Sequence, residues 1–514
     1  MDRGDRKMQE DMTASATITR TRTTTRWNFV RRQIEPTAAT TRRSCKAALT
    51  IVSFSLIAIT GYLPIEVAPL SASPAEAKSS KKSIKEVHRT RREALERARM
   101  RTIPKAKDSK TAKHEATQNT TAQGLQPPDP KTEGKPLTLN EKKAAVLAAP
   151  PEVLQRIGRH VITGYHASGD LKPLLERGAV GGIFVTARNA RGRNKPKLAA
   201  ELAEYRKLAV EAGQNTFWIS TDQEGGSVSR LSPPLPYQRA LPRIIGASKT
   251  TEERHKATET FAEKQAADLS SIGINLNFAP VADLNHNVRS SADKFTKIRY
   301  RAISDDPAIV TEVAKTYCEA LAKSGIYCTL KHFPGLGRVL TDTHITSGHL
   351  KVSTEILEKT DWIPFRQILS NSPAFLMISH AQLSGIDNDK PASTSPKIIQ
   401  NLLRETWKFN GVIVTDDLAM GAIVRRYNGG MAQAAIDALN AGADLVLVGS
   451  DGGQVYDVLY SLILADERGE LDPEKLKLSH KRLETAAKEM NRSPPATADD
   501  AANTAAAKTK TARQ

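Results

Sequence analysis

The fold is decided by one stretch, residues 307–335, which reads PAIVTEVAKTYCEALAKSGIYCTLKHFPG. Its first part carries apolar residues at helical spacing along one face: Val310, Val313, Ala314, Tyr317, Cys318 and Leu321. Pro307 after two aspartates is typical of a helix start, and Gly325 is typical of a helix end. The apolar run that follows the glycine ends in polar Lys331 and His332. The stretch therefore predicts a helix followed by a buried strand.

Seven more apolar runs of this kind flank the stretch, with helical segments between them. The eight runs cover residues 161–166, 181–189, 217–226, 274–283, 327–335, 374–381, 411–419 and 443–450. Strands that alternate with helices imply parallel pairing, and eight such units predict a single (β/α)8 TIM-type barrel over residues 145–490. A doubly wound open sheet is the alternative, but the glycine-rich turn that usually follows its first strand is absent.

The polar residues that end these runs are the first candidates for function, because barrel chemistry sits at the carboxyl ends of the strands. We expect eight side chains to converge on one pocket: Asp222, Glu224, Asp283, Lys331, His332, His380, Asp416 and Asp417. The loop after the fifth run, KHFPGLGRVLTDTH, adds Asp342 and His344. An Asp two residues from a His can orient one ring nitrogen and leave the other for proton transfer.

Several of these segments together resemble family 3 glycoside hydrolases: KHFPG followed by DTH, DQEGG, APVAD and TDDLAM. The resemblance covers residues 145–490. Within the family, the chain is most similar to the branch of bacterial β-N-acetylglucosaminidases that trim peptidoglycan fragments. It implies a retaining β-N-acetylhexosaminidase with a covalent glycosyl-aspartate intermediate, in which Asp416 is the nucleophile, His344 the acid/base and Asp342 its partner. It also implies that four residues bind the sugar: Asp222, Arg301, Lys331 and His332. No cofactor is expected, and the carboxylates and imidazoles lack the spacing of metal ligands.

Other residues are expected to support the site or to change its specificity. The supporting residues are expected to be Glu224, Asp283, His380 and Asp417. The chain departs from the family pattern at five positions, which leaves the substrate open: Ser227, Arg299, Tyr300, Ile303 and Leu336. Two other functions therefore remain: a family 3 β-glucosidase or β-xylosidase, and a non-catalytic carbohydrate-binding protein of the cell envelope.

The net charge of +19 is concentrated at the front of the chain. Residues 1–150 hold 29 Lys and Arg against 15 Asp and Glu, whereas the remaining residues hold 46 against 41. This basic excess lies outside the expected barrel and lacks interleaved aromatic residues, so we do not expect nucleic-acid binding. Residues 78–144 read as a charged linker, and residues 491–514 as a disordered tail.

Residues 47–65, AALTIVSFSLIAITGYLPI, form an uncharged run behind a basic leader. This pattern predicts a signal peptide or a membrane anchor within residues 1–77, and a buried helix is the alternative. We expect a monomer in the periplasm or one anchored to the inner membrane and facing the periplasm, with the cytoplasm as the alternative. Its expected partner is a small GlcNAc-containing carbohydrate.

Cys318 and Cys328 are expected to pack in the core unbonded, with a bridge as the alternative in an oxidising compartment.

Overall fold

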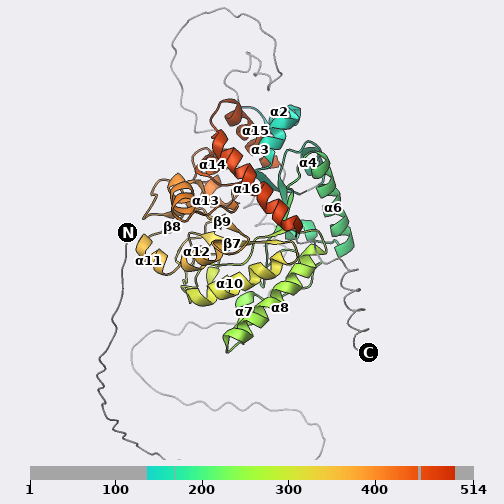
Figure 1. The fold of residues 1–514 in the computed structure, drawn as a ribbon. Coiled ribbons are helices and arrows are strands. Elements are labelled where there is room, and N and C mark those ends of the chain that lie inside the picture. Colours follow the sequence, from blue (N-terminus) through green and yellow to red (C-terminus); the bar gives the residue numbers. More distant parts are fainter. Residues whose placement is uncertain (1–135, 167, 450–452, 493–514) are drawn as a thin grey trace, which may run out of the picture. The chain divides into compact units, whose positions relative to one another are not determined.

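The structure is a computed structural model that describes residues 136–166, 168–449 and 453–492. Its centre is a closed barrel of parallel strands in the order β1-β12-β11-β9-β7-β6-β3-β2, with helices packed around it (Figure 1). Each of the eight predicted apolar runs contains one barrel strand. The predicted (β/α)8 barrel is confirmed, and the open sheet is excluded because β1 pairs with β12.

The barrel strands are β1 (Val161–Gly164), β2 (Gly182–Val185), β3 (Trp218–Thr221), β6 (Leu276–Asn277), β7 (Tyr327–Phe333), β9 (Ala374–Ile378), β11 (Ile413–Asp417) and β12 (Leu445–Val448). Two small sheets pair β4 (Gln223–Gly225) with β5 (Val228–Ser229) and β8 (Gly348–Leu350) with β10 (Ala381–Leu383). The α-helices are α2 (Leu139–Ala148), α3 (Pro151–Gly158), α4 (Ser168–Glu176), α5 (Ala187–Ala190), α6 (Lys195–Glu211), α7 (Leu241–Ile245), α8 (Thr251–Ser270), α9 (Ile298–Arg301), α10 (Pro307–Ala322), α11 (Thr354–Lys359), α12 (Ile363–Leu369), α13 (Gly421–Val424), α14 (Gly430–Ala441), α15 (Gly453–Glu467) and α16 (Pro473–Arg492). A 3₁₀ turn, η2 (Ala392–Thr394), and a π-helix, η3 (Lys397–Thr406), lie between β10 and β11.

The helix and strand predicted over residues 307–335 form α10 and β7. The side chain of Asp306 accepts a hydrogen bond from the backbone N–H of Ala308, which caps the start of α10. The chain leaves the helix through Gly325, whose φ of +68° lies in the left-handed region that glycine tolerates. Every residue of β7 is buried, as expected for a parallel strand covered on both faces.

An aromatic cluster fills the barrel interior at the amino ends of the strands. Trp218, Tyr327 and Phe375 contact one another with ring centroids 4.8–6.0 Å apart. Helix α16 covers this end, because Leu483 and its neighbours Ala486 and Ala487 belong to the same buried cluster. The amino end of the barrel is therefore closed by apolar packing.

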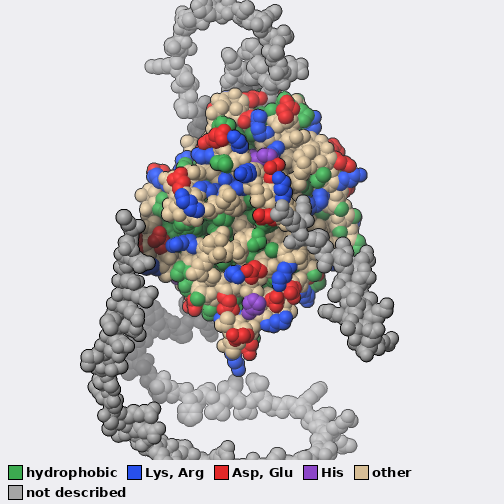
Figure 2. All heavy atoms as spheres, viewed as in Figure 1, with side chains coloured by type: hydrophobic (Ala, Val, Ile, Leu, Met, Phe, Trp, Pro, Cys, Tyr) green, Lys and Arg blue, Asp and Glu red, His purple; other side chains and the backbone are tan. Residues whose placement is uncertain are grey.

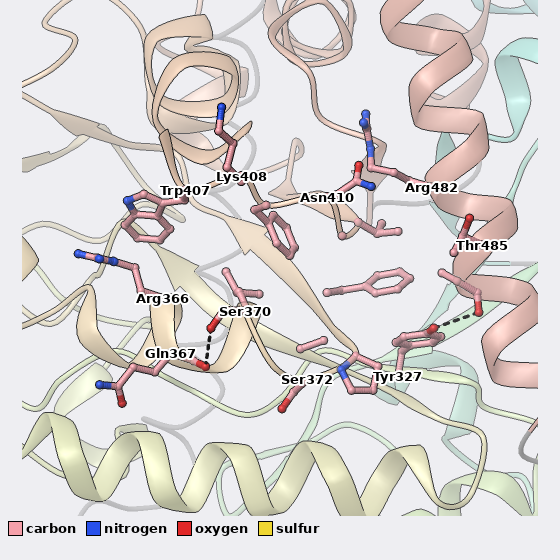
Figure 3. Close-up of a pocket in the computed structure, with 18 of the residues that line it drawn as sticks. Tyr327, Arg366, Gln367, Ser370, Ser372, Trp407, Lys408, Asn410, Arg482 and Thr485 are labelled. Atoms are coloured by element: carbon pink, nitrogen blue, oxygen red, sulfur yellow. Dashed lines mark hydrogen bonds between the residues drawn. The ribbon is translucent and has the colours of Figure 1, made fainter. Parts of the chain in front are cut away.

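A cavity of about 1170 Å³ lies beside α16 at this amino end (Figure 3). Its wall includes Tyr327, Arg366, Trp407, Asn410 and Arg482. None of the residues predicted to act in catalysis or sugar binding lines this cavity. The predicted residues instead lie at the carboxyl ends of the strands, such as Lys331 and His332 near the end of β7 and Asp416 near the end of β11.

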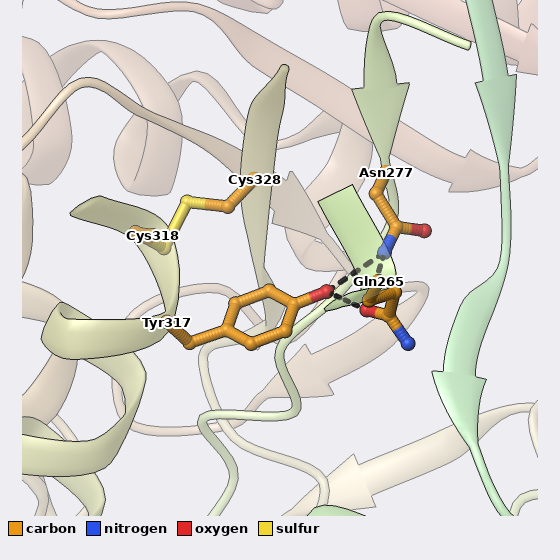
Figure 4. The surroundings of a disulfide bond; sticks show 5 residues. All are labelled: Gln265, Asn277, Tyr317, Cys318 and Cys328. Atoms are coloured by element: carbon orange, nitrogen blue, oxygen red, sulfur yellow. Dashed lines mark hydrogen bonds between the residues drawn. A yellow bond between two sulfur atoms is a disulfide. The ribbon is translucent and has the colours of Figure 1, made fainter. Parts of the chain in front are cut away.

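Cys318 of α10 and Cys328 of β7 form a disulfide bond (Figure 4). Both cysteines are buried in the core, as expected, but they are bonded and not free, because the tight connection from α10 to β7 brings their Cα atoms to 5.2 Å. Next to the bond, the Tyr317 hydroxyl bonds Gln265 and accepts a hydrogen bond from the Asn277 amide at 2.8 Å. This network joins α8, α10 and β6 on one side of the barrel.

Helices extend across both ends of the predicted barrel region, residues 145–490. Helix α2 begins at Leu139 and packs against α15, so helical structure starts before residue 145. Helix α16 extends to Arg492, past residue 490. The predicted leader and apolar run within 1–77, most of the linker and most of the tail lie outside the described residues. Where the chain is described, no helix is both long and apolar enough to cross a membrane.

The surface of the folded part carries charges of both signs. On the face in view in Figure 2, basic and acidic side chains are interspersed. This agrees with the nearly balanced composition after residue 150.

Candidate active site

Asp416 lies at the carboxyl end of β11, where its carboxylate accepts a hydrogen bond from the Asp417 amide at 2.9 Å. Burial works to raise the pKa of Asp416, but the charges of three nearby histidines hold it below its ordinary value: His332, His380 and His344. Asp416 is therefore ionised at neutral pH. An ionised carboxylate at the end of a barrel strand can act as a nucleophile.

Asp417 is held quite differently from its neighbour. Its carboxylate accepts hydrogen bonds from the amides of Ala419 and Gly449, at 2.9 and 2.8 Å. A Cβ on Gly449 would lie 2.6 Å from the carboxylate, so this approach of the backbone requires glycine. Burial raises the pKa of Asp417 to about 6. These contacts tie the end of β11 to the residue that follows β12.

His380, which follows β9, is buried behind the two aspartates. Its Nε2 bonds the backbone oxygen of Asp417 at 3.0 Å, and its Nδ1 bonds the Ser393 hydroxyl at 2.8 Å. Burial lowers the pKa of His380. Because both ring nitrogens already have protein partners, His380 braces β11 and has no free nitrogen for a substrate.

Asp342 and His344 form a pair on the loop between β7 and β8. Asp342 is fully buried, and its carboxylate is 2.9 Å from His344 Nδ1. It also accepts hydrogen bonds from the amides of Lys294 and Phe295 and from the Thr296 hydroxyl, at 3.0, 2.6 and 2.8 Å. Burial works to raise the pKa of Asp342, but the bonds from Phe295, Thr296 and His344 lower it below its ordinary value. Asp342 is therefore a fixed anion that orients the His344 ring.

The side chain of His344 is 43% exposed, and its Nε2 has no hydrogen-bond partner within the part of the chain that the structure describes. The loop that carries it packs on α13, the helix after Asp416. Gly421 and Ala422 donate backbone hydrogen bonds to the carbonyl oxygens of His344 and Thr343, at 2.9 and 3.1 Å. The imidazole is thus fixed beside the segment that follows the candidate nucleophile, with one nitrogen free to exchange a proton.

Lys331 connects two carboxylates at the carboxyl end of β7. Its side chain is only 2% exposed, and its Nζ lies 2.7 Å from Asp222 and 2.6 Å from Glu224. Arg301 also binds Glu224, with Nε and Oε2 2.9 Å apart. Burial works to raise the pKa of Glu224, but Arg301 and Lys331 hold it well below its ordinary range. The result is a charged cluster whose donors and acceptors can bind sugar hydroxyls.

His332 lies next to this cluster and is oriented by Asp283. Its Nδ1 is 2.7 Å from the Asp283 carboxylate, which also accepts the Leu336 amide at 2.7 Å. Its Nε2 is 3.4 Å from Arg301 Nη2. Asp283 thus holds both the ring of His332 and the start of the loop that carries Asp342 and His344.

The structure brings the predicted site residues together at one end of the barrel. Direct contacts link Lys331 to Asp222, His332 to Arg301, and His344 to Asp342. Asp416 is coupled to the histidines through their charges and not through a direct bond. Among the described residues, no group of three or more His, Cys, Asp or Glu side chains is arranged to hold a metal ion.

Sequence reasoning did not identify the segment 293–297 as part of the site, although it supplies three of the hydrogen bonds to Asp342. It also missed Asp361, which binds Arg338 of the same loop at 2.9 Å and His286 at 2.8 Å. Neither contact has a local sequence signal, because both depend on how loops from separate strands cross.

Comparisons with known proteins identify the family and agree with the fold. Residues 143–486 match the model of the glycosyl hydrolase family 3 N-terminal domain. A β-hexosaminidase of Xanthomonas oryzae is 32% identical over 289 residues, which cover 56% of this chain and 81% of that protein.

Two solved structures are also similar. A family 3 β-N-acetylglucosaminidase of Paenibacillus superposes with a TM-score of 0.59 at 28% identity, covering 66% of this chain and 62% of the other. A family 3 glycosyl hydrolase of Mycobacterium smegmatis superposes with a TM-score of 0.57 at 30% identity, covering 66% of this chain and 98% of the other. The chain belongs to glycosyl hydrolase family 3 and is a glycoside hydrolase.

Proposed function

We propose that this protein is a retaining β-N-acetylhexosaminidase that removes terminal β-linked N-acetylglucosamine from peptidoglycan fragments or chitooligosaccharides. The observation that carries the proposal is the Asp342–His344 pair, whose loop is bonded to the helix that follows Asp416. A carboxylate and a proton-carrying imidazole at the mouth of one barrel are the two groups that a retaining glycosidase needs. The sugar specificity is supported by the relatives named β-hexosaminidase.

In the first step, Asp416 attacks the anomeric carbon while His344 Nε2 gives a proton to the glycosidic oxygen, so that the leaving group departs as an alcohol. In the second step, His344 takes a proton from water, and the resulting hydroxide releases the sugar from Asp416. Two inversions give net retention. Asp342 stabilises the protonated imidazole in both steps, because its buried carboxylate stays charged.

A trapping experiment tests this mechanism. We would use a 5-fluoro-N-acetylglucosaminyl fluoride, because fluorine at C5 slows both steps, while the fluoride leaving group lets the first step proceed. The expected result is a protein heavier by one sugar, with the label mapped to Asp416. An active enzyme that gains no mass, or a product of inverted configuration, would contradict the covalent step. The first of these results would point to attack by the substrate's own acetamido group.

Two substrates separate the proposal from its alternatives. Nitrophenyl-β-N-acetylglucosaminide is expected to be hydrolysed, and nitrophenyl-β-glucoside only slowly. The reverse preference would indicate a β-glucosidase. Binding of chitooligosaccharides without turnover of either substrate, and unchanged by Asp416→Ala, would indicate a non-catalytic binding protein.

We also propose that the protein acts outside the cytoplasm. The uncharged run at residues 47–65 behind a basic leader supports export or anchoring, and the Cys318–Cys328 bond is typical of an oxidising compartment. Cell fractionation, with sequencing of the mature N-terminus, tests this. A protein found in the cytoplasm with its first residues intact would overturn it.

A further inference from the structure

Phe295 is a large apolar side chain in an unusual place. It is 65% exposed, although the barrel contains an extensive buried core. It lies between β6 and α9, and its amide donates a hydrogen bond to the Asp342 carboxylate at 2.6 Å. Its ring meets the His344 ring edge to face, with centroids 6.1 Å apart and planes at 61°. An exposed phenyl ring therefore flanks the imidazole that we assign as the acid/base.

The position of the Phe295 ring relates it to the leaving group of the substrate. Asp342 and Thr296 occupy the Nδ1 side of the His344 ring, at 2.9 and 3.2 Å, so Nε2 is the nitrogen that faces the glycosidic oxygen. The group attached to the far side of that oxygen is the leaving group. It extends past the His344 ring, and the exposed phenyl ring of Phe295 lies 6.1 Å from that ring between centroids.

We propose that Phe295 is the platform for a leaving-group sugar, and that the preferred substrates therefore carry a second pyranose ring beyond the terminal residue. This inference rests on the proposed function. A pyranose ring presents one face of C–H groups, which packs on an aromatic ring, while its hydroxyls remain in water. The backbone of Phe295 is already fixed by Asp342, so the platform is in place before the substrate binds.

Phe295 could instead act only by shielding or positioning the Asp342–His344 pair. The two roles differ in which substrates they affect. A positioning role concerns the proton that His344 donates, and every unactivated leaving group needs that proton. A platform concerns only leaving groups that are large enough to reach the phenyl ring.

The test compares two substrates that need the same protonation. Chitobiose has a sugar as its leaving group, and methyl β-N-acetylglucosaminide has an alkoxide of similar basicity but no ring. For Phe295→Ala we expect kcat/KM to fall about three- to tenfold on chitobiose and to stay within about twofold on the methyl glycoside. Phe295→Tyr, which keeps the ring, is expected to retain activity on both.

Tyr237→Ala is the matched control, because Tyr237 is an aromatic residue of similar exposure, 64%, that lies beside α8. This variant is expected to leave kcat/KM unchanged on both substrates. Equal losses on both substrates for Phe295→Ala would show a positioning role, and no loss on either would show that the ring does not meet the leaving group. Both results overturn the inference. A wild-type protein that hydrolyses neither substrate would instead refute the proposed function itself.

Discussion

The two ends of the barrel differ in the side chains that fill them. The amino end is closed by aromatic and aliphatic packing under α16, and it has the cavity of about 1170 Å³. The carboxyl end holds Lys331, Asp416 and their partners, whose charges are mostly buried and paired. Burying charges costs free energy, so such a cluster contributes little to stability. Buried charge also occurs at the amino end, where Asp444 binds Arg404 and Arg482. What distinguishes the carboxyl end is that histidines gather around a carboxylate, and we infer the candidate site from this feature and not from the size of a cavity.

The largest effect is expected at the carboxyl end, from Asp416→Asn. The amide keeps the shape of the side chain but cannot act as a nucleophile, so kcat should fall by at least about 10⁴-fold. The measurement is hydrolysis of nitrophenyl-N-acetylglucosaminide, with thermal unfolding to show that the fold is intact. Asp417→Asn is the matched control, because an amide oxygen can still accept the bonds from Ala419 and Gly449. If both variants were equally inactive, the result would contradict the assignment of Asp416 as the nucleophile and Asp417 as a supporting residue.

His344→Ala should have the next largest effect. Loss of the acid/base is expected to lower kcat/KM by about 10²- to 10⁴-fold on chitobiose, whose leaving group needs a proton. The loss should be much smaller on a dinitrophenyl glycoside, whose leaving group departs as a stable anion. Rates measured across leaving groups of graded acidity test this. A loss that is the same for all of them would contradict the role of His344 in protonating the leaving group.

The amino end is expected to show the opposite behaviour. Leu483 of α16 is fully buried in the cluster that closes the barrel. Leu483→Ala removes apolar contacts and leaves a cavity, so the free energy of unfolding should fall by about 2–5 kcal/mol. Urea unfolding measures this change, and kcat at a temperature where the variant is folded should be unchanged. A variant that is stable but inactive would break the separation of the two ends.

The smallest effect concerns pH and again compares the two aspartates. Because the pKa of Asp417 is raised to about 6, the folded state holds this proton more tightly than the unfolded state. The contribution of Asp417 to the free energy of unfolding should therefore fall as pH rises from about 4 to 6 and stay constant above about 6. The fall should be at most about 3 kcal/mol.

Urea unfolding of the wild type and Asp417→Asn across this pH range measures the difference, because other titrating groups cancel. The pKa of Asp416 is lowered, so its own carboxyl is ionised between pH 5 and 7 and takes up no proton in that range. A flat difference for Asp417→Asn would show that its carboxyl titrates normally.

The sequence by itself determined the barrel and predicted the end at which the candidate site lies. Apolar runs that alternate with helical faces bury their surfaces as parallel strands under helices, and five of the eight runs end in the polar residues named as candidates. Spacing along the chain also identified the Asp342–His344 pair, because the two residues are neighbours on one loop.

Only the tertiary structure decided which side chains from separate elements and loops contact one another. The bonds from Lys294 and Phe295 to Asp342, the shared partner Glu224 and the Cys318–Cys328 bond depend on positions in space to a fraction of an ångström. No periodicity or local propensity encodes such positions, since loop paths are set by the packing of the whole barrel.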